Sequence, residues 1–132
     1  MVLTPGLVGE VRATVDASML ANAVGSGYLG VLSTPSMIAL MENAAAHAVE
    51  GVLPPGQTTV GTRLDVRHLA ATPVGLEVRA RAELVEVDGR KLTFHVEAFD
   101  PQDKIGEGTH ERAVVDPARL LARAEAKRPQ AQ

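Results

Sequence analysis

The 132-residue sequence has no cysteine and no tryptophan, and aromatic residues make up only 2% of it. Without cysteine the chain has no disulfides, no thiolate nucleophile and no cysteine-bound zinc. The scarcity of aromatic rings also speaks against stacking on nucleic-acid bases. We therefore expect a cytoplasmic protein whose core consists of valine, leucine, alanine, isoleucine and methionine.

A strong charge of one sign and a long hydrophobic run are also lacking. The net charge is -3 at pH 7, and the basic residues are scattered along the chain, which is not the electrostatic pattern that a nucleic-acid backbone requires. No apolar run approaches the roughly 18 residues of a membrane-spanning helix, and the first residues do not resemble a secretory signal. We expect neither nucleic acid nor a membrane as a partner.

The length and composition fit a single globular domain. With 45% hydrophobic and 22% charged residues, the chain is long enough to bury one core but shows no repeat or linker that would divide it. We therefore treat residues 1–132 as one domain.

The most informative segment is PSMIALMENAAAHAV, residues 35–49, which is apolar on nearly every side. Thr34 followed by Pro35 predicts the start of a helix, because threonine can cap free N–H groups and proline fits the first turn. Gly51 and the two prolines after it predict the end of the helix near residue 50.

Glu42 is the only acidic residue within this apolar segment. Burying an ionised carboxylate without a partner costs several kcal/mol, so its presence indicates either a functional role or a structural one. The structural alternatives are a kink, an exposed helix end or a salt bridge to an arginine. The segment alone does not decide between them.

Alternating hydrophobicity predicts strands at residues 7–15, 58–70, 76–84, 92–98 and 104–115. Residues 16–33 are small and rich in glycine, which predicts a loop or a broken helix, and a short helix is predicted from Pro117 to about Lys127. Asp88 and Gly89 form the dipeptide preferred in tight hairpin turns. In the second strand Val60, Leu64, Val66 and His68 share one face by parity, so we expect His68 to point inward.

This order of elements predicts an α+β fold in which an antiparallel sheet covers the long helix on one side. A helix that is apolar on more than one side needs a second cover, so we predict a homodimer. Thr34 and Glu42 lie eight residues apart on the helix, or about 12 Å. A site that uses both residues would draw them from two chains or bridge them through substrate and water.

Several stretches are similar to the hotdog-fold thioesterases, and in particular to the fluoroacetyl-CoA thioesterase family. They are TPSMIALME at residues 34–42, VGTRLDVRHLAAT at residues 60–72, the segment 73–84 and GEGTHERAVV at residues 106–115. The resemblance implies a hotdog fold, in which the sheet wraps around the central helix, and hydrolysis of an acyl-CoA thioester.

Carried over by position, the resemblance assigns the catalytic residues to Thr34, Glu42 and His68. It implies that Glu42 attacks the thioester carbonyl or activates water, that His68 transfers protons, and that Thr34 hydrogen-bonds the carboxylate or the acyl group. The residues themselves leave open whether Glu42 is nucleophile or general base.

Three further residues are candidates for contact with substrate. The backbone N–H of Gly61 could donate a hydrogen bond to the substrate, although the glycine could equally ease strand curvature. Arg112 could orient Glu42, contact a CoA phosphate or form an ordinary surface salt bridge. Tyr28 lies in the glycine-rich segment before Thr34.

The other histidines give no sign of a metal site. His95 and His110 alternate with polar neighbours and are expected to face solvent, and His47 could pack in the core. No pair of histidines has a ligand spacing such as H-x-x-x-H with a nearby carboxylate. We therefore expect neither a metal nor another cofactor.

One departure from the family bears on specificity. Fluoroacetyl-selective members carry aromatic lid residues before the threonine, whereas this chain has Gly25 and Tyr28 there. We therefore expect a general short or medium acyl-CoA as substrate rather than a fluorinated one. The main alternative is a non-catalytic acyl-CoA or acyl-carrier binding protein of the same fold; a hotdog dehydratase or hydratase and a structural dimer module are weaker alternatives.

Overall fold

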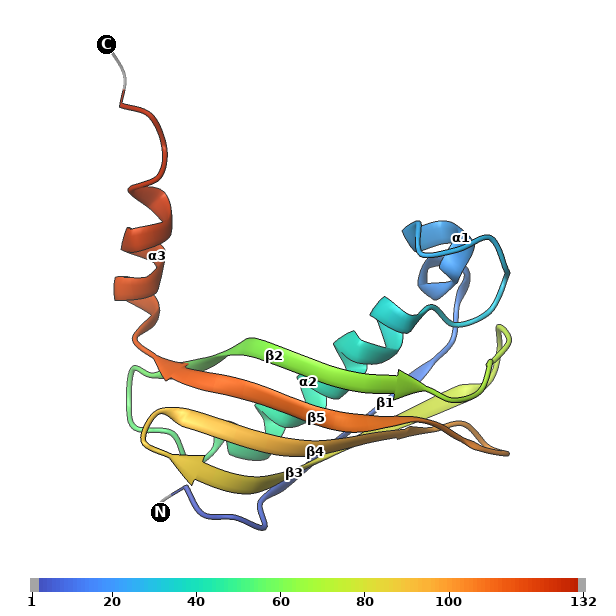
Figure 1. Ribbon diagram of the computed structural model, residues 1–132, viewed down its shortest axis with the longest axis horizontal. Helices are drawn as coiled ribbons and strands as arrows, with labels where there is room; N and C mark the ends of the chain where they lie inside the picture. Colours follow the sequence, from blue (N-terminus) through green and yellow to red (C-terminus); the bar gives the residue numbers. More distant parts are fainter. Residues whose placement is uncertain (1–2, 131–132) are drawn as a thin grey trace.

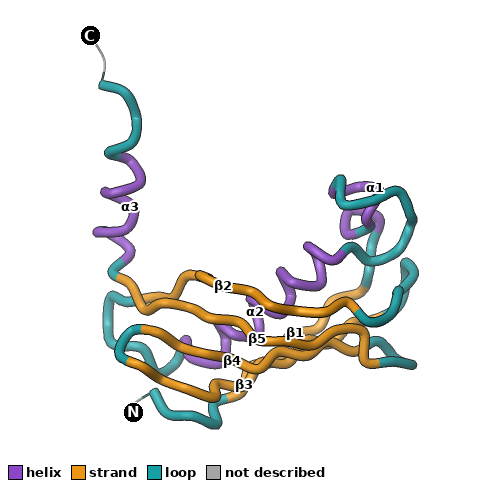
Figure 2. The backbone as a smooth tube through the Cα atoms, in the orientation of Figure 1, coloured by secondary structure: helices purple, strands orange, loops and turns teal. Residues whose placement is uncertain are grey.

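A single antiparallel sheet of five strands carries one long helix on one of its faces (Figure 1, Figure 2). The computed structural model describes residues 3–130. The strands lie in the order β1-β3-β4-β5-β2, so β1 and β2 form the two edges. The strands are β1 (Val8–Thr14), β2 (Thr58–His68), β3 (Glu77–Asp88), β4 (Lys91–Phe99) and β5 (Lys104–Val115); the helices are α1 (Ala21–Val24), α2 (Thr34–Glu50) and α3 (Pro117–Glu125), with a 3-10 turn at Ala17–Met19.

The long helix α2 begins and ends where Pro35 and Gly51 predict, but its N-cap residue differs from our prediction. Ser33 is the N-cap residue, and its side chain accepts a hydrogen bond from the backbone N–H of Ser36 at 3.1 Å. Thr34 is the first helical residue instead. Because Ser33 satisfies the helix end, the Thr34 hydroxyl is left available for a tertiary contact.

The edge strand β2 contains a bulge that the alternation of hydrophobic residues did not reveal. Its pairing with β5 shifts register between Gly61 and Arg63, and a bulge places one extra residue on one strand. Thr59 and Gly61 lie opposite inward-facing residues of β5, and after the bulge so do Leu64 and His68. The predicted inward orientation is therefore wrong for Val60 and correct for His68.

The core between the sheet and α2 is aliphatic, as the composition predicts. Phe94 is its largest fully buried side chain, accompanied by Met37 and Met41 from α2. On β3 and β4 every second residue from Val78 to Leu84 and from Leu92 to Ala98 is buried. This period of two gives each strand one inner and one outer face.

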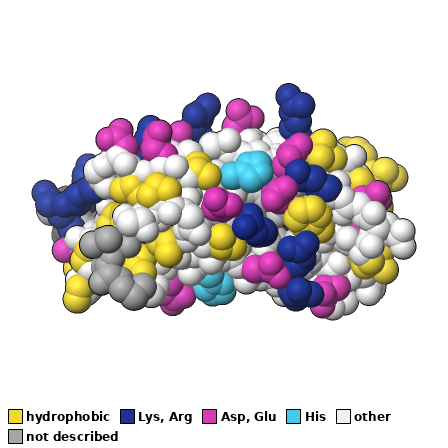
Figure 3. All heavy atoms as spheres, turned by 90° about the horizontal axis from the view of Figure 1, so that it is seen from below, with side chains coloured by type: hydrophobic (Ala, Val, Ile, Leu, Met, Phe, Trp, Pro, Cys, Tyr) yellow, Lys and Arg dark blue, Asp and Glu magenta, His cyan; other side chains and the backbone are white. Residues whose placement is uncertain are grey.

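The face seen in Figure 3 carries interspersed charges rather than one sign. Several outward residues form exposed ion pairs, among them Arg12 with Glu77 at 3.1 Å between Nη1 and Oε1. Such pairs contribute little to stability individually. No helix within residues 3–130 has the length and apolar character needed to cross a membrane.

The last helix, α3, stands away from the sheet at the end of β5 (Figure 1). Asp116 caps its N-terminus through hydrogen bonds from the N–H groups of Ala118 and Arg119. All of its residues after Pro117 are exposed. Packing against this chain therefore does little to hold α3 in place.

Gly9 on β1 allows α2 to approach the sheet closely. A Cβ atom built on Gly9 would collide with the carbonyl oxygen of Ala44 and would lie 2.6 Å from the backbone nitrogen of Ala48. Both partners are helix backbone, which cannot rotate away.

We predict that Gly9→Ala lowers the free energy of unfolding by about 1 to 3 kcal/mol, the usual cost of overpacking, as measured by urea denaturation. Gly51→Ala is the matched control, because a Cβ atom at Gly51 meets nothing within 4 Å. Equal midpoints for Gly9→Ala and the wild type would show that the helix is free to shift.

Candidate active site

Thr34 at the start of α2 and His68 at the end of β2 are hydrogen-bonded to each other. The Thr34 Oγ1 atom lies 2.7 Å from Nδ1 of His68. The Nε2 atom of His68 is buried and has no hydrogen-bond partner among the described residues. One ring nitrogen of His68 is therefore left unpaired within the described part of the chain.

Burial lowers the pKa of His68 below its ordinary value, and this effect outweighs the opposing one of the nearby Ala70 backbone. The imidazole is consequently neutral near pH 7 and can accept a proton. A neutral imidazole held by a hydroxyl group is suited to general acid-base chemistry.

A cavity of about 500 Å³ lies beside this pair. Apart from Ala21, its lining residues come from two segments, residues 26–34 and residues 68–71. Tyr28 lines the cavity and is 98% exposed, so its ring stands at the edge rather than inside. Leu29 and Leu69 also line the cavity and are exposed. A wall that combines apolar side chains with a few polar groups, here including the Thr34 hydroxyl and the His68 imidazole, is typical of a small-molecule site.

Glu42 belongs to a second group, farther along α2. Its Oε2 atom lies 3.9 Å from Nη1 of Arg112, and its side chain is 39% exposed. The carboxylate is thus neither sequestered from water nor unpaired, which corrects our expectation of a charge buried in apolar surroundings. The salt bridge to an arginine, which we considered as a structural alternative, is present.

Arg112 on β5 is only 8% exposed, which excludes an ordinary surface salt bridge. Its Nε donates to Thr59 Oγ1 at 2.9 Å, and its Nη2 donates to the Thr59 carbonyl oxygen at 3.0 Å. These two bonds to β2 fix the plane of the guanidinium group. Arg112 is therefore placed to orient Glu42, and little of it is accessible to a CoA phosphate.

His110 completes this group, although we expected it to face solvent. It is fully buried, with Nδ1 2.9 Å from the Arg63 carbonyl oxygen and Nε2 3.1 Å from Nη1 of Arg112. A carbonyl only accepts and a guanidinium only donates, so the ring is neutral and carries its proton on Nδ1. The alternation with buried Val114 could have placed His110 and Arg112 on the inner face.

Gly61 leaves the space that the Glu42 carboxylate needs. A Cβ atom at Gly61 would lie 2.7 Å from Glu42 Oε2 and 3.1 Å from Cε1 of His110. Any side chain here would displace the acid. The suggested hydrogen bond from the Gly61 N–H to substrate remains a prediction.

The three predicted catalytic residues therefore form two separate groups within one chain. Thr34 and His68 form one, whereas Glu42 sits with Arg112 in the other. No hydrogen bond or ion pair joins the two groups within residues 3–130. The spacing along α2, about 12 Å from Thr34 to Glu42, accounts for the separation.

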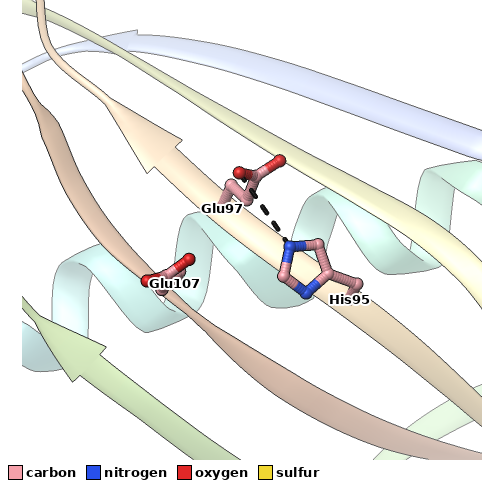
Figure 4. Close-up of side chains that lie close together, drawn as sticks. All are labelled: His95, Glu97 and Glu107. Atoms are coloured by element: carbon pink, nitrogen blue, oxygen red, sulfur yellow. Dashed lines mark ion pairs between the residues drawn. The ribbon is translucent and has the colours of Figure 1, made fainter.

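A cluster of His95, Glu97 and Glu107 on β4 and β5 has the spacing of a metal site (Figure 4). The Nζ atom of Lys104 lies 2.8 Å from Glu97 and 2.6 Å from Glu107, and the Lys104 side chain lowers the pKa of Glu97. The ammonium group thus already pairs with both carboxylates, on the sheet face opposite α2.

Comparison with known proteins gives one consistent family. The family described as fluoroacetyl-CoA-specific thioesterase matches residues 15–118. The fluoroacetyl-CoA thioesterase of Streptantibioticus cattleyicolor is 46% identical over 99 residues, which are 75% of this chain and 71% of that protein.

Two solved structures show the same fold. A variant of the fluoroacetyl-CoA thioesterase FlK in complex with acetyl-CoA has a TM-score of 0.91 at 34% identity, over 96% of this chain and all of that one. A hot-dog-like protein from Thermanaerovibrio acidaminovorans has a TM-score of 0.84 at 24% identity, over 96% and 94% of the two chains. The predicted hotdog fold is confirmed.

The lowered pKa values of His68 and His110 make stability depend on pH. Burial is the main cause in both, and the charge of Arg112 lowers the pKa of His110 further. The unfolded chain, with histidine pKa near 6.5, binds more protons than the folded chain just below that pH. The free energy of unfolding therefore falls as the pH drops from about 7 towards 5.

We expect urea midpoints measured between pH 7.5 and 5 to show this decline, and His110→Gln to flatten it. The carboxyl groups with lowered pKa, Glu97 and Asp100, act at lower pH and leave this window unaffected. An undiminished slope in His110→Gln would mean that the ring is not held neutral by its neighbours.

Proposed function

Because the chain belongs to the fluoroacetyl-CoA-specific thioesterase family, we propose that it hydrolyses the thioester of a short or medium acyl-CoA. Water adds to the thioester carbonyl, the carbon-sulfur bond breaks, and the products are a carboxylic acid and free CoA. The observation that carries the proposal is the bond of 2.7 Å between Thr34 and His68 beside a partly apolar cavity.

The chemistry needs a base or nucleophile and a group that handles protons. Glu42 serves as nucleophile or general base, and the Arg112 guanidinium orients its carboxylate at 3.9 Å. His68, neutral near pH 7, accepts a proton and returns it to the leaving sulfur. The Thr34 hydroxyl positions the imidazole and hydrogen-bonds the acyl group.

The acyl group lies in the cavity, at whose edge Tyr28 is exposed. Gly25 and Tyr28 occupy the segment that forms an aromatic lid in fluoroacetyl-selective members, so a preference for fluorinated substrates is not part of the proposal. The composition without cysteine supports a cytoplasmic location, and neither nucleic acid nor a membrane is part of the proposed function.

A homodimer is the second part of the proposal. The edge strand β2 has 11 residues and, within residues 3–130, no neighbouring strand on one side. An unpaired edge favours addition of another strand. On the same side Leu64 is exposed, and α2 leaves Ala39 and Asn43 uncovered. Pairing of two β2 edges would extend the sheet and cover α2 with a second copy.

This dimer would unite the two groups of residues. Two β2 strands can pair antiparallel about a centre at Leu64 or at Asp65. When the extra residue of the bulge is counted, the first centre sets His68 opposite the partner's Thr59 and the second sets it opposite the partner's Gly61. Both of these neighbour Glu42 or its arginine within each chain. One active site would then contain Thr34 and His68 from one protomer and the carboxylate from its partner.

A non-catalytic acyl-CoA or acyl-carrier binding protein is the competing function. The separation of Glu42 from the Thr34–His68 pair within one chain favours it if the chain is monomeric. A monomeric protein that binds CoA but releases no thiol would support this alternative.

The wild type should release thiol from acyl-CoA substrates, as detected with a thiol reagent on a panel from acetyl-CoA to octanoyl-CoA that includes fluoroacetyl-CoA. Glu42→Gln should lower kcat/KM by at least about 100-fold, the usual contribution of a general base. Glu77→Gln is the matched control, since Glu77 lies on β3 outside the proposed site with its side chain exposed. Equal rates for wild type and Glu42→Gln would refute the assigned role.

Mixing inactive chains tests whether the site is shared. Thr34→Val and Glu42→Gln each disable every site in a homodimer. In a mixed dimer one site carries both substitutions and the other carries neither, so unfolding and refolding equal amounts together should restore about a quarter of the wild-type rate for random pairing. If all three residues acted within one chain, the mixture would stay inactive.

A further inference from the structure

Three arginines line a second cavity, of about 270 Å³, at the base of α3. Arg90 comes from the turn between β3 and β4, and Arg119 and Arg123 come from α3. The remaining lining residues include Gln57, just before β2, and Asp116. The cavity thus gathers three guanidinium groups in a chain whose net charge is -3.

These charges are not compensated within the described part of the chain. None of the three arginines has a carboxylate within the 4.0 Å of an ion pair there, whereas Arg12, Arg63, Arg79 and Arg81 all do. Asp116 accepts the N–H groups that begin α3. Arg119 also sits in the first turn of α3, where the helix dipole disfavours a cation.

A groove between α2 and β2 adjoins this cavity and reaches the part of α2 that carries Glu42. The groove is lined by Asn43, His47 and the acidic Glu50 of α2 and by Thr58 and Thr59 of β2. Gln57 lines both the groove and the arginine cavity. Asn43 is the neighbour of Glu42, and Thr59 holds Arg112. Gln57 precedes Gly61 by four residues, or about 13 Å along an extended strand.

We propose that Arg90, Arg119 and Arg123 bind a phosphate group of the CoA whose thioester lies at Glu42 of the same chain. The inference rests on the proposed function. Guanidinium groups bind phosphate through paired, charge-assisted hydrogen bonds, and CoA carries its phosphates at the end remote from the sulfur. The groove along α2 and β2 accommodates the chain between the two ends.

The test uses Arg119→Gln/Arg123→Gln in the full-length protein. With acetyl-CoA the KM should rise about tenfold or more while kcat stays near the wild-type value, because the lost bonds lie far from the reacting carbonyl. With S-acetylpantetheine, which has no nucleotide, variant and wild type should have the same KM. Arg12→Gln/Arg81→Gln removes the same charge from arginines that already pair with glutamates and should leave both values unchanged.

Calorimetric titration with CoA separates failure of this inference from failure of the proposed function. Weaker binding of CoA to the double variant than to the control supports the phosphate site even if no thioester is hydrolysed. Unchanged affinity for CoA overturns it, whatever the activity. Titration with dephospho-CoA identifies which phosphate group of CoA is bound. If inorganic phosphate binds to the site while the double variant keeps the wild-type affinity for CoA, the site binds free anions and the assignment is overturned.

Discussion

The close approach of α2 to the sheet is the constraint on which both groups of residues depend. Small residues allow it: Gly9 lies against the helix backbone at Ala44 and Ala48, and Gly106 lies against the side chain of Met37. A larger residue would push the helix outward, and hydrogen bonds between α2 and β2 tolerate little displacement. The 2.7 Å bond between Thr34 and His68 exists because the helix is held at this depth.

Residues that start or end helices and strands made much of the fold predictable. Pro35 and Gly51 bound α2 correctly, Asp88 and Gly89 form the expected hairpin turn, and alternation located the strands to within a few residues. These features are local, since they depend on backbone preferences and on a period of two or 3.6 residues. The resemblance to hotdog thioesterases supplied the topology that such local features leave open.

The errors of prediction lie where tertiary contacts decide. Ser33 and Thr34 are both good caps, and only the position of His68 explains why the threonine hydroxyl is used elsewhere. The bulge after Gly61 reverses the parity of Val60, which the alternation of hydrophobic residues does not reveal. The prediction that His110 faces solvent is wrong because its immediate neighbours are polar. The ring is nevertheless buried, and Arg112 satisfies its Nε2 atom there.

The division of Thr34, Glu42 and His68 between two places in one chain gives the proposed dimer a chemical role as well as a packing role. In the proposed mechanism, the Thr34–His68 pair would carry the proton and the Glu42–Arg112 pair would supply the charged oxygen. The arginines at the base of α3 adjoin the groove between α2 and β2, in the same chain as the Glu42–Arg112 pair that they would serve. Each protomer would then bind the phosphate end of one CoA through its arginines, and its Thr34–His68 pair would act on the thioester of the other CoA.

The bonds around Arg112 have a consequence for how this sequence can diverge. The guanidinium is satisfied at once by Thr59 and His110, and the empty volume at Gly61 admits the acid that it orients. Lysine could not reproduce the forked geometry, and a bulkier residue at Gly61 would require a shorter acid. Relatives should therefore exchange these five positions, Glu42 included, together or not at all, as a single covarying unit.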